Sequence, residues 1–399
     1  MAKQSVTDVK LDNKKVLMRC DFNVPLDEKQ RITDDTRIKE SLRTINYLLE
    51  RNCSLILCSH LGKPKGKPVP ELSLKPVAER IKTLVPAALK IIMADDCIGP
   101  EVKKLAAGLK AKEILLLENL RFHAEEEANN AEFAKELASL AEIFVQEAFG
   151  TVHRAHASTV GVTNYLPAVA GFLIQKELDY LGNAINNAKK PFVAVLGGAK
   201  VSSKIAVLYN LLEKVDSMII GGGMIYTFLK AKGISIGNSL VEDDKLSVAK
   251  DILEKANSRN IQILLPEDHI IADKVAEDAK STLTSGIEIP AGQIGVDIGP
   301  LTIKKYVDNL INARTIFWNG PMGVFEIAKF EKGTLEIAKA VAAATDKGAI
   351  SIIGGGDSVA AVNKMGLKER MSHISTGGGA ALEFLEGKEL PGVAALKDK

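Results

Sequence analysis

Two glycine triplets, one followed by an acidic residue, carry the clearest chemical signal in the chain. Segment 349–383 reads AISIIGGGDSVAAVNKMGLKERMSHISTGGGAALE, so two short apolar runs each end in glycines and pass into a helical pattern. A ligand touches backbone closely only where no Cβ intervenes, and the first turn of a helix offers unpaired N–H groups. The pattern therefore predicts phosphate-binding corners. The triplets are Gly354, Gly355 and Gly356, and Gly377, Gly378 and Gly379.

Asp357 directly follows the first triplet, and its carboxylate would repel a bare phosphate. We therefore interpret it as a ligand for a divalent cation that accompanies the phosphates. Tight strand-to-helix packing alone could explain one isolated triplet. Two triplets, one followed by an acid, favour a ligand site.

A second set of residues, mostly basic, lies in the first half of the chain, each at the end of a strand-like run or in the following loop. A single arginine of this kind is most often a solvated surface residue. Several at successive strand ends predict a site for a small anionic substrate, because arginine forms paired hydrogen bonds with carboxylate and phosphate. The set comprises Arg19, Asp21, Asn23, Arg37, His60, Lys63, Arg121, His153, Arg154 and His156.

Alternating strand-like and helical segments must position these residues. The expected strands of the first half are 16–19, 54–59, 89–94, 113–118 and 143–146, and those of the second half are 192–196, 218–220, 261–265, 315–318, 350–353 and 373–375. Helical patterns between them include 37–51, 131–140 and 201–215. Such alternation predicts an α/β fold with two doubly wound parallel sheets, in which ligands bind at the carboxyl ends of the strands.

The two halves differ in composition. Of the 32 glycines, 8 lie before residue 190 and 24 after it, whereas 8 arginines precede that residue and 3 follow it. This contrast predicts an arginine-rich site for a small acid in one domain and a glycine-rich polyphosphate site in the other. The weakly patterned segment 161–190, with a helical stretch at 178–188, is expected to join them as a hinge.

Overall composition excludes several classes of protein. The formal charge of +2, from 52 basic and 50 acidic side chains, provides no general attraction to nucleic acid or to a membrane. No apolar stretch is long enough to span a bilayer, and the first residues have no apolar core of a signal peptide. Cys20, Cys53, Cys58 and Cys97 lack metal-type spacing, so we expect reduced core thiols, a cytoplasmic protein, and neither a disulfide nor a structural zinc.

Familiar nucleotide-binding signatures are missing. Segment 62–68, GKPKGKP, has too few residues between its glycines for a P-loop and ends in proline, and no G-x-G-x-x-G follows a strand. A dinucleotide-dependent dehydrogenase, which two α/β halves would allow, is thereby disfavoured. A catalytically inactive binding protein on the same fold is the other alternative.

Six motifs, in this order, resemble phosphoglycerate kinase: KVLMRCDFNVP (15–25), ENLRFH (118–123), GGAKVSSK (197–204), WNGPMGVFE (318–326), GGGDS (354–358) and STGGGA (375–380). The resemblance spans nearly the whole chain. It implies two Rossmann-like domains, an N-terminal 3-phosphoglycerate-binding domain (1–172, with the tail 388–399 packed back on it) and a C-terminal nucleotide-binding domain (173–387).

The resemblance also implies roles for individual residues. The acceptor substrate, 3-phosphoglycerate, is expected at Asp21, Phe22, Asn23, Arg37, His60, Lys63, Arg121 and Arg154. ATP or ADP, with Mg²⁺ on Asp357, is expected at Lys200, Lys204, Gly221, Gly222, Gly295, Glu326 and the triplet 354–356. Catalytic roles fall to Arg37, Lys200 and the amides of Gly377, Gly378 and Gly379. Without the resemblance, Gly221 and Gly222 could be packing glycines, and Lys200 and Lys204 a solvated helix face.

The implied activity is reversible phosphoryl transfer between ATP and 3-phosphoglycerate by a monomer whose domains close on the substrates. In one position the chain departs from the family pattern, since an arginine is usual where it has Lys63. The charge is kept and the planar fork is lost.

Overall fold

The computed structural model describes residues 2–399, which divide into two compact units. The first contains the residues up to Asp179 together with Glu389–Lys399, and the second is Tyr180–Lys388. The division falls inside helix α6 (Phe172–Asn186), seven residues beyond the boundary predicted at 172/173. The weakly patterned segment 161–190 therefore contains the whole of helix α6, which begins six residues before the helix predicted at 178–188.

The first unit is built on a six-stranded parallel sheet in the order β3-β4-β2-β1-β5-β6. Strands β2, β3 and β4 lie on one side of β1 and strands β5 and β6 on the other, so the order reverses between β1 and β5. Its elements are β1 (Lys15–Arg19), α1 (Thr36–Glu50), β2 (Ser54–Cys58), α2 (Lys75–Leu84), β3 (Lys90–Met93), α3 (Pro100–Gly108), β4 (Glu113–Leu116), η2 (Leu120–Phe122), α4 (Ala124–Glu127), α5 (Ala131–Ala138), β5 (Ile143–Gln146), β6 (Ala168–Ala170) and α14 (Pro391–Ala394).

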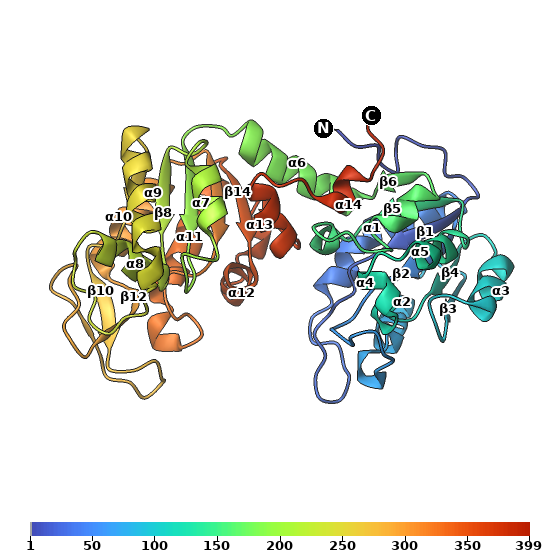
Figure 1. The fold of residues 1–399 in the computed structure, drawn as a ribbon, viewed down its shortest axis with the longest axis horizontal. Helices are drawn as coiled ribbons and strands as arrows, with labels where there is room; N and C mark the ends of the chain where they lie inside the picture. Colours follow the sequence, from blue (N-terminus) through green and yellow to red (C-terminus); the bar gives the residue numbers. More distant parts are fainter. Residues whose placement is uncertain (1) are drawn as a thin grey trace. The chain divides into compact units, whose positions relative to one another are not determined.

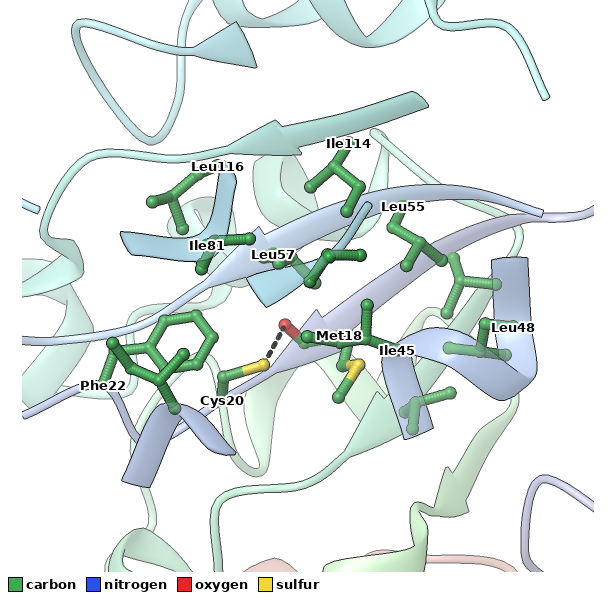
Figure 2. Packing of buried hydrophobic residues seen from close by; sticks show 14 of the residues in the cluster. Met18, Cys20, Phe22, Ile45, Leu48, Leu55, Leu57, Ile81, Ile114 and Leu116 are labelled. Carbon is green, nitrogen blue, oxygen red and sulfur yellow. Dashed lines mark hydrogen bonds between the residues drawn. The ribbon is translucent and has the colours of Figure 1, made fainter. Parts of the chain in front are cut away.

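The core of the first unit follows from alternating side-chain direction in strands that are buried on both faces. Met18, Leu55 and Leu57 pack with Ile45 and other residues of α1 and α2 in one cluster, as Figure 2 shows. The intervening residues of the same strands, including Leu17 and Ile56, are equally buried but lie outside this cluster. Nearly continuous apolar runs of this kind are typical of parallel sheets covered on both faces.

The two ends of the chain lie side by side in the first unit (Figure 1). Lys3 forms an antiparallel bridge with Asp398, and the Gly392 N–H donates to the Val152 carbonyl at 2.8 Å. The Lys397 N–H also donates to the carbonyl of Ala168 in β6 at 3.1 Å, so the C-terminal segment is tied to the first unit.

The second unit repeats the scheme with a parallel sheet in the order β15-β14-β13-β7-β8-β9, which reverses between β7 and β13. Its elements are β7 (Phe192–Leu196), α7 (Ile205–Leu211), β8 (Ser217–Ile220), α8 (Met224–Ala231), α9 (Leu246–Ser258), β9 (Gln262–Leu264), β10 (His269–Ala272), β11 (Ser281–Leu283), β12 (Ile294–Ile298), α10 (Pro300–Leu310), β13 (Thr315–Asn319), α11 (Lys332–Asp346), β14 (Ile350–Gly354), α12 (Gly356–Lys364), β15 (His373–Ile374) and α13 (Gly379–Leu385). The predicted fold class, α/β with two parallel sheets, is confirmed.

Two predictions about the second unit were wrong or incomplete. The helix expected at 201–215 is shorter at both ends, because residues 201–204 and 212–214 form turns and α7 is Ile205–Leu211. A small antiparallel sheet, in the order β11-β10-β12, was not anticipated at all. Its strand β11 is exposed along its whole length, so it lacks the apolar pattern by which a strand is recognised.

Candidate functional site

In the first unit, polar side chains gather around the carboxyl end of β1, beside the point where the strand order reverses. Arg19, the last residue of β1, is buried, and its Nε donates to Ser158 Oγ at 2.9 Å while Nη2 lies 3.2 Å from His60 Nδ1. Asp21 is also buried and forms an ion pair of 2.6 Å with Arg37, which lies in the first turn of α1.

Gly62 connects two further predicted residues through its backbone. Its N–H donates to Asn23 Oδ1 at 2.9 Å, and its carbonyl accepts from Arg121 Nη1 at 2.9 Å. Arg121, in η2 after β4, is buried and also lies 3.3 Å from a carboxylate oxygen of Glu127. The loops that follow β1, β2 and β4 therefore meet here, as expected for neighbouring parallel strands.

The electrostatics of this cluster favour an anion. Burial, followed by the charges of Arg19, Arg121 and Arg37, holds the pKa of His60 well below its usual range, so the imidazole is neutral near pH 7. Burial and the charge of Arg121 lower the pKa of His156 to about 4. The positive potential thus comes from arginines, which keep their charge at every physiological pH.

The remaining predicted residues of the first unit occupy different environments. Arg154 is exposed, with its Nε 3.1 Å from His153 Nε2, and its charge contributes to the lowered pKa of Arg121, for which burial is the larger cause. Lys63 is exposed on the loop that follows Gly62. Phe22 belongs instead to the hydrophobic core, and its N–H donates to Ser59 Oγ at 2.8 Å.

In the second unit, a cavity of about 510 Å³ combines four of the predicted residues. Gly222, Gly295, Glu326 and Asp357 all line it, although they come from the loop after β8, strand β12, the loop after β13 and helix α12. Its wall also includes apolar side chains such as Leu240 and Met322. An apolar slot with a few polar groups is the usual form of a small-molecule site.

Close packing explains why glycine occupies three of the predicted positions. A Cβ on Gly221 would come within 2.5 Å of the Met322 thioether, and one on Gly295 within 1.9 Å of the Tyr226 hydroxyl. Gly222 has φ of +67°, and a Cβ there would meet the Gly198 backbone at 2.5 Å. Packing and ligand approach are therefore compatible at Gly222 and Gly295, which line the cavity, and Gly221 packs against Met322 of the cavity wall.

The two predicted lysines differ sharply in environment. Lys204 is buried at the N-terminal end of α7 and donates to Asn319 Oδ1. Burial lowers its pKa to about 8, against the opposing effect of the Asp357 carboxylate. Lys200 is exposed and precedes the turn 201–204, so the alternative interpretation, that the two lysines form one solvated helix face, does not hold.

Both glycine triplets follow a strand and lead into a helix, as predicted. Gly354 ends β14, Gly355 has φ of +83°, and α12 begins at Gly356. The second triplet leads from β15 into α13, and Gly378 has φ of +50°. In this arrangement the Gly377 N–H donates to Ser375 Oγ at 3.1 Å, so that amide is already used within the loop.

Sequence reasoning missed Asn319, which ends β13 where the order of the second sheet reverses. Its Oδ1 accepts from Lys204, and its buried Nδ2 forms no hydrogen bond within residues 2–399. That nitrogen lies 2.9 Å from where a Cβ on Gly355 would be. Its position within the quoted motif WNGPMGVFE was the only available signal.

Comparison with known proteins is consistent across the chain. A family model described as phosphoglycerate kinase matches residues 6–388. The chain is 57% identical over 399 residues to the phosphoglycerate kinase of Chlorobium phaeobacteroides, covering all of both chains. It is 58% identical to a cytosolic phosphoglycerate kinase of Triticum aestivum, covering 97% of this chain and 96% of the relative. The structure of phosphoglycerate kinase from Coxiella burnetii is similar with a TM-score of 0.88 and 43% identity, covering 98% of each chain.

Proposed function

Because this chain belongs to the phosphoglycerate kinase family and is an enzyme with that kinase activity in glycolysis, we propose how its two units divide the reaction. The first unit binds 3-phosphoglycerate in the arginine cluster around β1. The second binds ATP or ADP in the cavity lined by Gly222, Gly295, Glu326 and Asp357. The observation that supports this division most directly is that the arginine cluster and the glycine-lined cavity lie on separate units.

In the first unit, the proposed roles follow from charge and reach. Arg37 and Arg121 each use part of their guanidinium on Asp21, Gly62 or Glu127, which holds the groups in place and leaves other N–H donors for the substrate. Arg154 and Lys63 are exposed at the edge of the cluster and add positive charge. The carboxylate and phosphate of 3-phosphoglycerate are the complementary groups.

The residues around Asp357 fit a magnesium ion. The exposed carboxylate of Asp357 lines the nucleotide cavity and supplies one anionic oxygen. Mg²⁺ binds in this way, through one or two carboxylates with phosphate oxygens and water as its other ligands. When bound, the ion neutralises negative charge on the nucleotide phosphates.

Transfer itself requires alignment and charge neutralisation more than proton chemistry, since the attacking group is a carboxylate that needs no general base. We assign to Lys200 and Arg37 the stabilisation of the charge on the equatorial oxygens of the moving phosphoryl group. Lys204 accompanies the nucleotide phosphates, and the amides of Gly378 and Gly379 face the transferred group. The substrates bind different units, so the units must close together, which also excludes water from the acyl phosphate.

A plant relative is described as cytosolic, which supports a cytoplasmic location, and we propose a monomer. Within residues 2–399, every helix is too short or too polar to cross a membrane.

The proposal is tested by a coupled assay with ATP and 3-phosphoglycerate on the parent and on Lys200→Ala. The variant should lose far more kcat than nucleotide affinity, because Lys200 is assigned to charge that develops during transfer. Lys347→Ala, at an exposed lysine after α11, is the matched control and should behave like the parent. A raised KM for ATP at unchanged kcat would remove Lys200 from the catalytic role.

A further inference from the structure

A cluster of three metal-ligating residues contains none of the residues assigned to the two substrate sites, although His123 follows Arg121 by two positions. Asp96 and Cys97 follow β3, and His123 follows η2 after β4. One ligand atom from each residue lies within 4.8 Å of the other two. Strands β3 and β4 are neighbours in the sheet, which brings residues from two separate segments to the same edge.

The Asp96 carboxylate is at the centre of the cluster. Its Oδ1 lies 2.7 Å from His123 Nε2 and accepts from the Cys97 N–H at 2.6 Å. The thiol of Cys97 is close to the same carboxylate, and its pKa is raised mainly by burial and further by the charge of Asp96. Imidazole nitrogen, thiol sulfur and carboxylate oxygen therefore converge on one position.

The scaffold holds these residues without a ligand. Between the two loops, the Ala94 N–H donates to the Leu116 carbonyl at 2.9 Å, and the Glu118 N–H to the Asp96 carbonyl at 3.3 Å. The His123 ring packs against Phe133 with 5.5 Å between ring centroids. A set of ligands fixed by its surroundings loses little freedom when it binds an ion.

An ion can reach the cluster from solvent. The side chains of Asp96 and His123 are 51% and 26% exposed, whereas Cys97 is buried behind them. They line a cavity of about 660 Å³ whose wall also includes the acidic residues Asp95 and Glu118 and one basic residue, Lys75, so acidic groups outnumber basic ones. The negative charge of this entrance favours approach of a cation.

We propose that Asp96, Cys97 and His123 bind Zn²⁺, with water as the fourth ligand. Sulfur and imidazole ligands select zinc over magnesium and calcium, which prefer oxygen, and three protein ligands with one open position are a common zinc arrangement. Binding releases the thiol proton to solvent and leaves the imidazole proton on Nδ1. The site is distinct from Asp357 and does not depend on the roles proposed above.

The proposed site is not a structural zinc site of the kind that the spacing of the four cysteines disfavours. It uses a single cysteine, and its histidine lies in another segment, so no spacing rule reveals it. The backbone hydrogen bonds between the loops already hold the segments together, so zinc is a ligand of the folded chain and is not required for folding.

Cobalt(II) titration of the full chain tests the proposal, because Co²⁺ replaces Zn²⁺ and a cobalt–thiolate bond gives a charge-transfer absorption band. We expect one equivalent to produce this band and Zn²⁺ to abolish it competitively. Cys97→Ser should eliminate the band. His123→Gln should weaken cobalt binding by about tenfold or more, since even partners of metal ligands contribute that much.

Controls distinguish this site from other thiols and from oxygen-only binding. Cys53→Ser changes another buried free cysteine and should retain the full band. Asp357→Asn should also retain it, because a carboxylate site gives no sulfur band. Circular dichroism verifies that each variant is folded. Asp96→Asn, at an exposed position, removes another of the proposed zinc ligands. A band that is absent in the parent, that survives in Cys97→Ser, or that disappears in Cys53→Ser would overturn the proposal.

Discussion

At the scale of single residues, burial determines which basic groups respond to pH. Arg19 and Arg121 are buried, and arginine as a residue type keeps its charge at physiological pH, whereas burial and neighbouring charges lower the pKa values of His60 and His156. Lys204 is intermediate, with a pKa of about 8. The lysine therefore changes its charge just above physiological pH.

We expect kcat/KM for ATP to fall above pH 8 as Lys204 loses its proton, because the neutral amine no longer attracts phosphate. At pH 9 the value should be about tenfold below its plateau, since kcat/KM reports the pKa of the free enzyme. Steady-state kinetics from pH 6 to 10 measure the fall. Lys204→Arg should remove this fall in kcat/KM. Asp357→Asn should shift the fall to lower pH, because the Asp357 carboxylate raises the pKa of Lys204. A profile that is the same in all three proteins would contradict the assignment.

The second residue-scale prediction concerns Lys63, which adjoins the glycine where Asn23 and Arg121 meet. Lys63→Arg should lower KM for 3-phosphoglycerate by roughly fivefold, or about 1 kcal/mol, because guanidinium can form two parallel hydrogen bonds with phosphate. The KM for ATP should not change.

Lys67→Arg, at an exposed position in the same loop, is the matched control. If Lys63→Ala has the parent's KM for 3-phosphoglycerate, Lys63 is a solvent residue without a role in binding.

At the scale of elements, a buried carboxyl group connects α1, β5 and the start of α6. Glu147 directly follows β5, and its Oε1 accepts from Thr44 Oγ1 of α1 at 2.6 Å and from the Leu173 N–H of α6 at 3.1 Å. Gly171 leaves room for it, because a Cβ there would lie 1.7 Å from the other carboxylate oxygen. Burial raises the pKa of Glu147 to about 8.

Glu147 should make stability depend on pH in a predictable direction. Between about pH 4.5 and 8 the folded chain keeps a proton that the unfolded chain has released, so the free energy of unfolding should decrease as pH rises. The slope from this group is up to about 1.4 kcal/mol per pH unit. Urea denaturation from pH 5 to 8 measures it.

Glu147→Gln should flatten that dependence, because glutamine does not titrate. Glu50→Gln, at an exposed carboxylate that ends the same helix α1, should keep the parent's slope. Equal slopes in the parent and in Glu147→Gln would show that the buried carboxyl does not hold its proton.

At the scale of the whole molecule, the proposed reaction requires two units that each bind one substrate. In the proposed division each substrate alone contacts one of the two units, so only the pair can stabilise a closed state through contacts with both. We expect the radius of gyration from small-angle X-ray scattering to decrease most with 3-phosphoglycerate and nucleotide together, and less with either alone. Arg37→Ala should reduce the response to the pair. An unchanged radius with both substrates bound would exclude closure from the mechanism.

Sequence alone determined the two parallel sheets and the motifs at their edges. Strands such as β2 and β7 are continuous apolar runs, and α1 has one apolar face, so local chemistry specifies both without knowledge of distant partners. The glycine triplets likewise required strand-to-helix corners for reasons of backbone conformation. The roles of individual residues came from the resemblance and remain proposals.

Only the tertiary structure decided which side chains meet and in what environment. The exposed strand β11 is a strand because of its pairing with β10, and α7 starts late although residues 201–204 carry a helical pattern. Three features join segments that are far apart in the sequence. They are the pairing of Lys204 with Asn319, the burial of Glu147, and the convergence of Cys97 with His123. The distances between such segments, the desolvation of their side chains and the charges around them depend on how the chain packs. The spacing of residues within one segment therefore does not predict them.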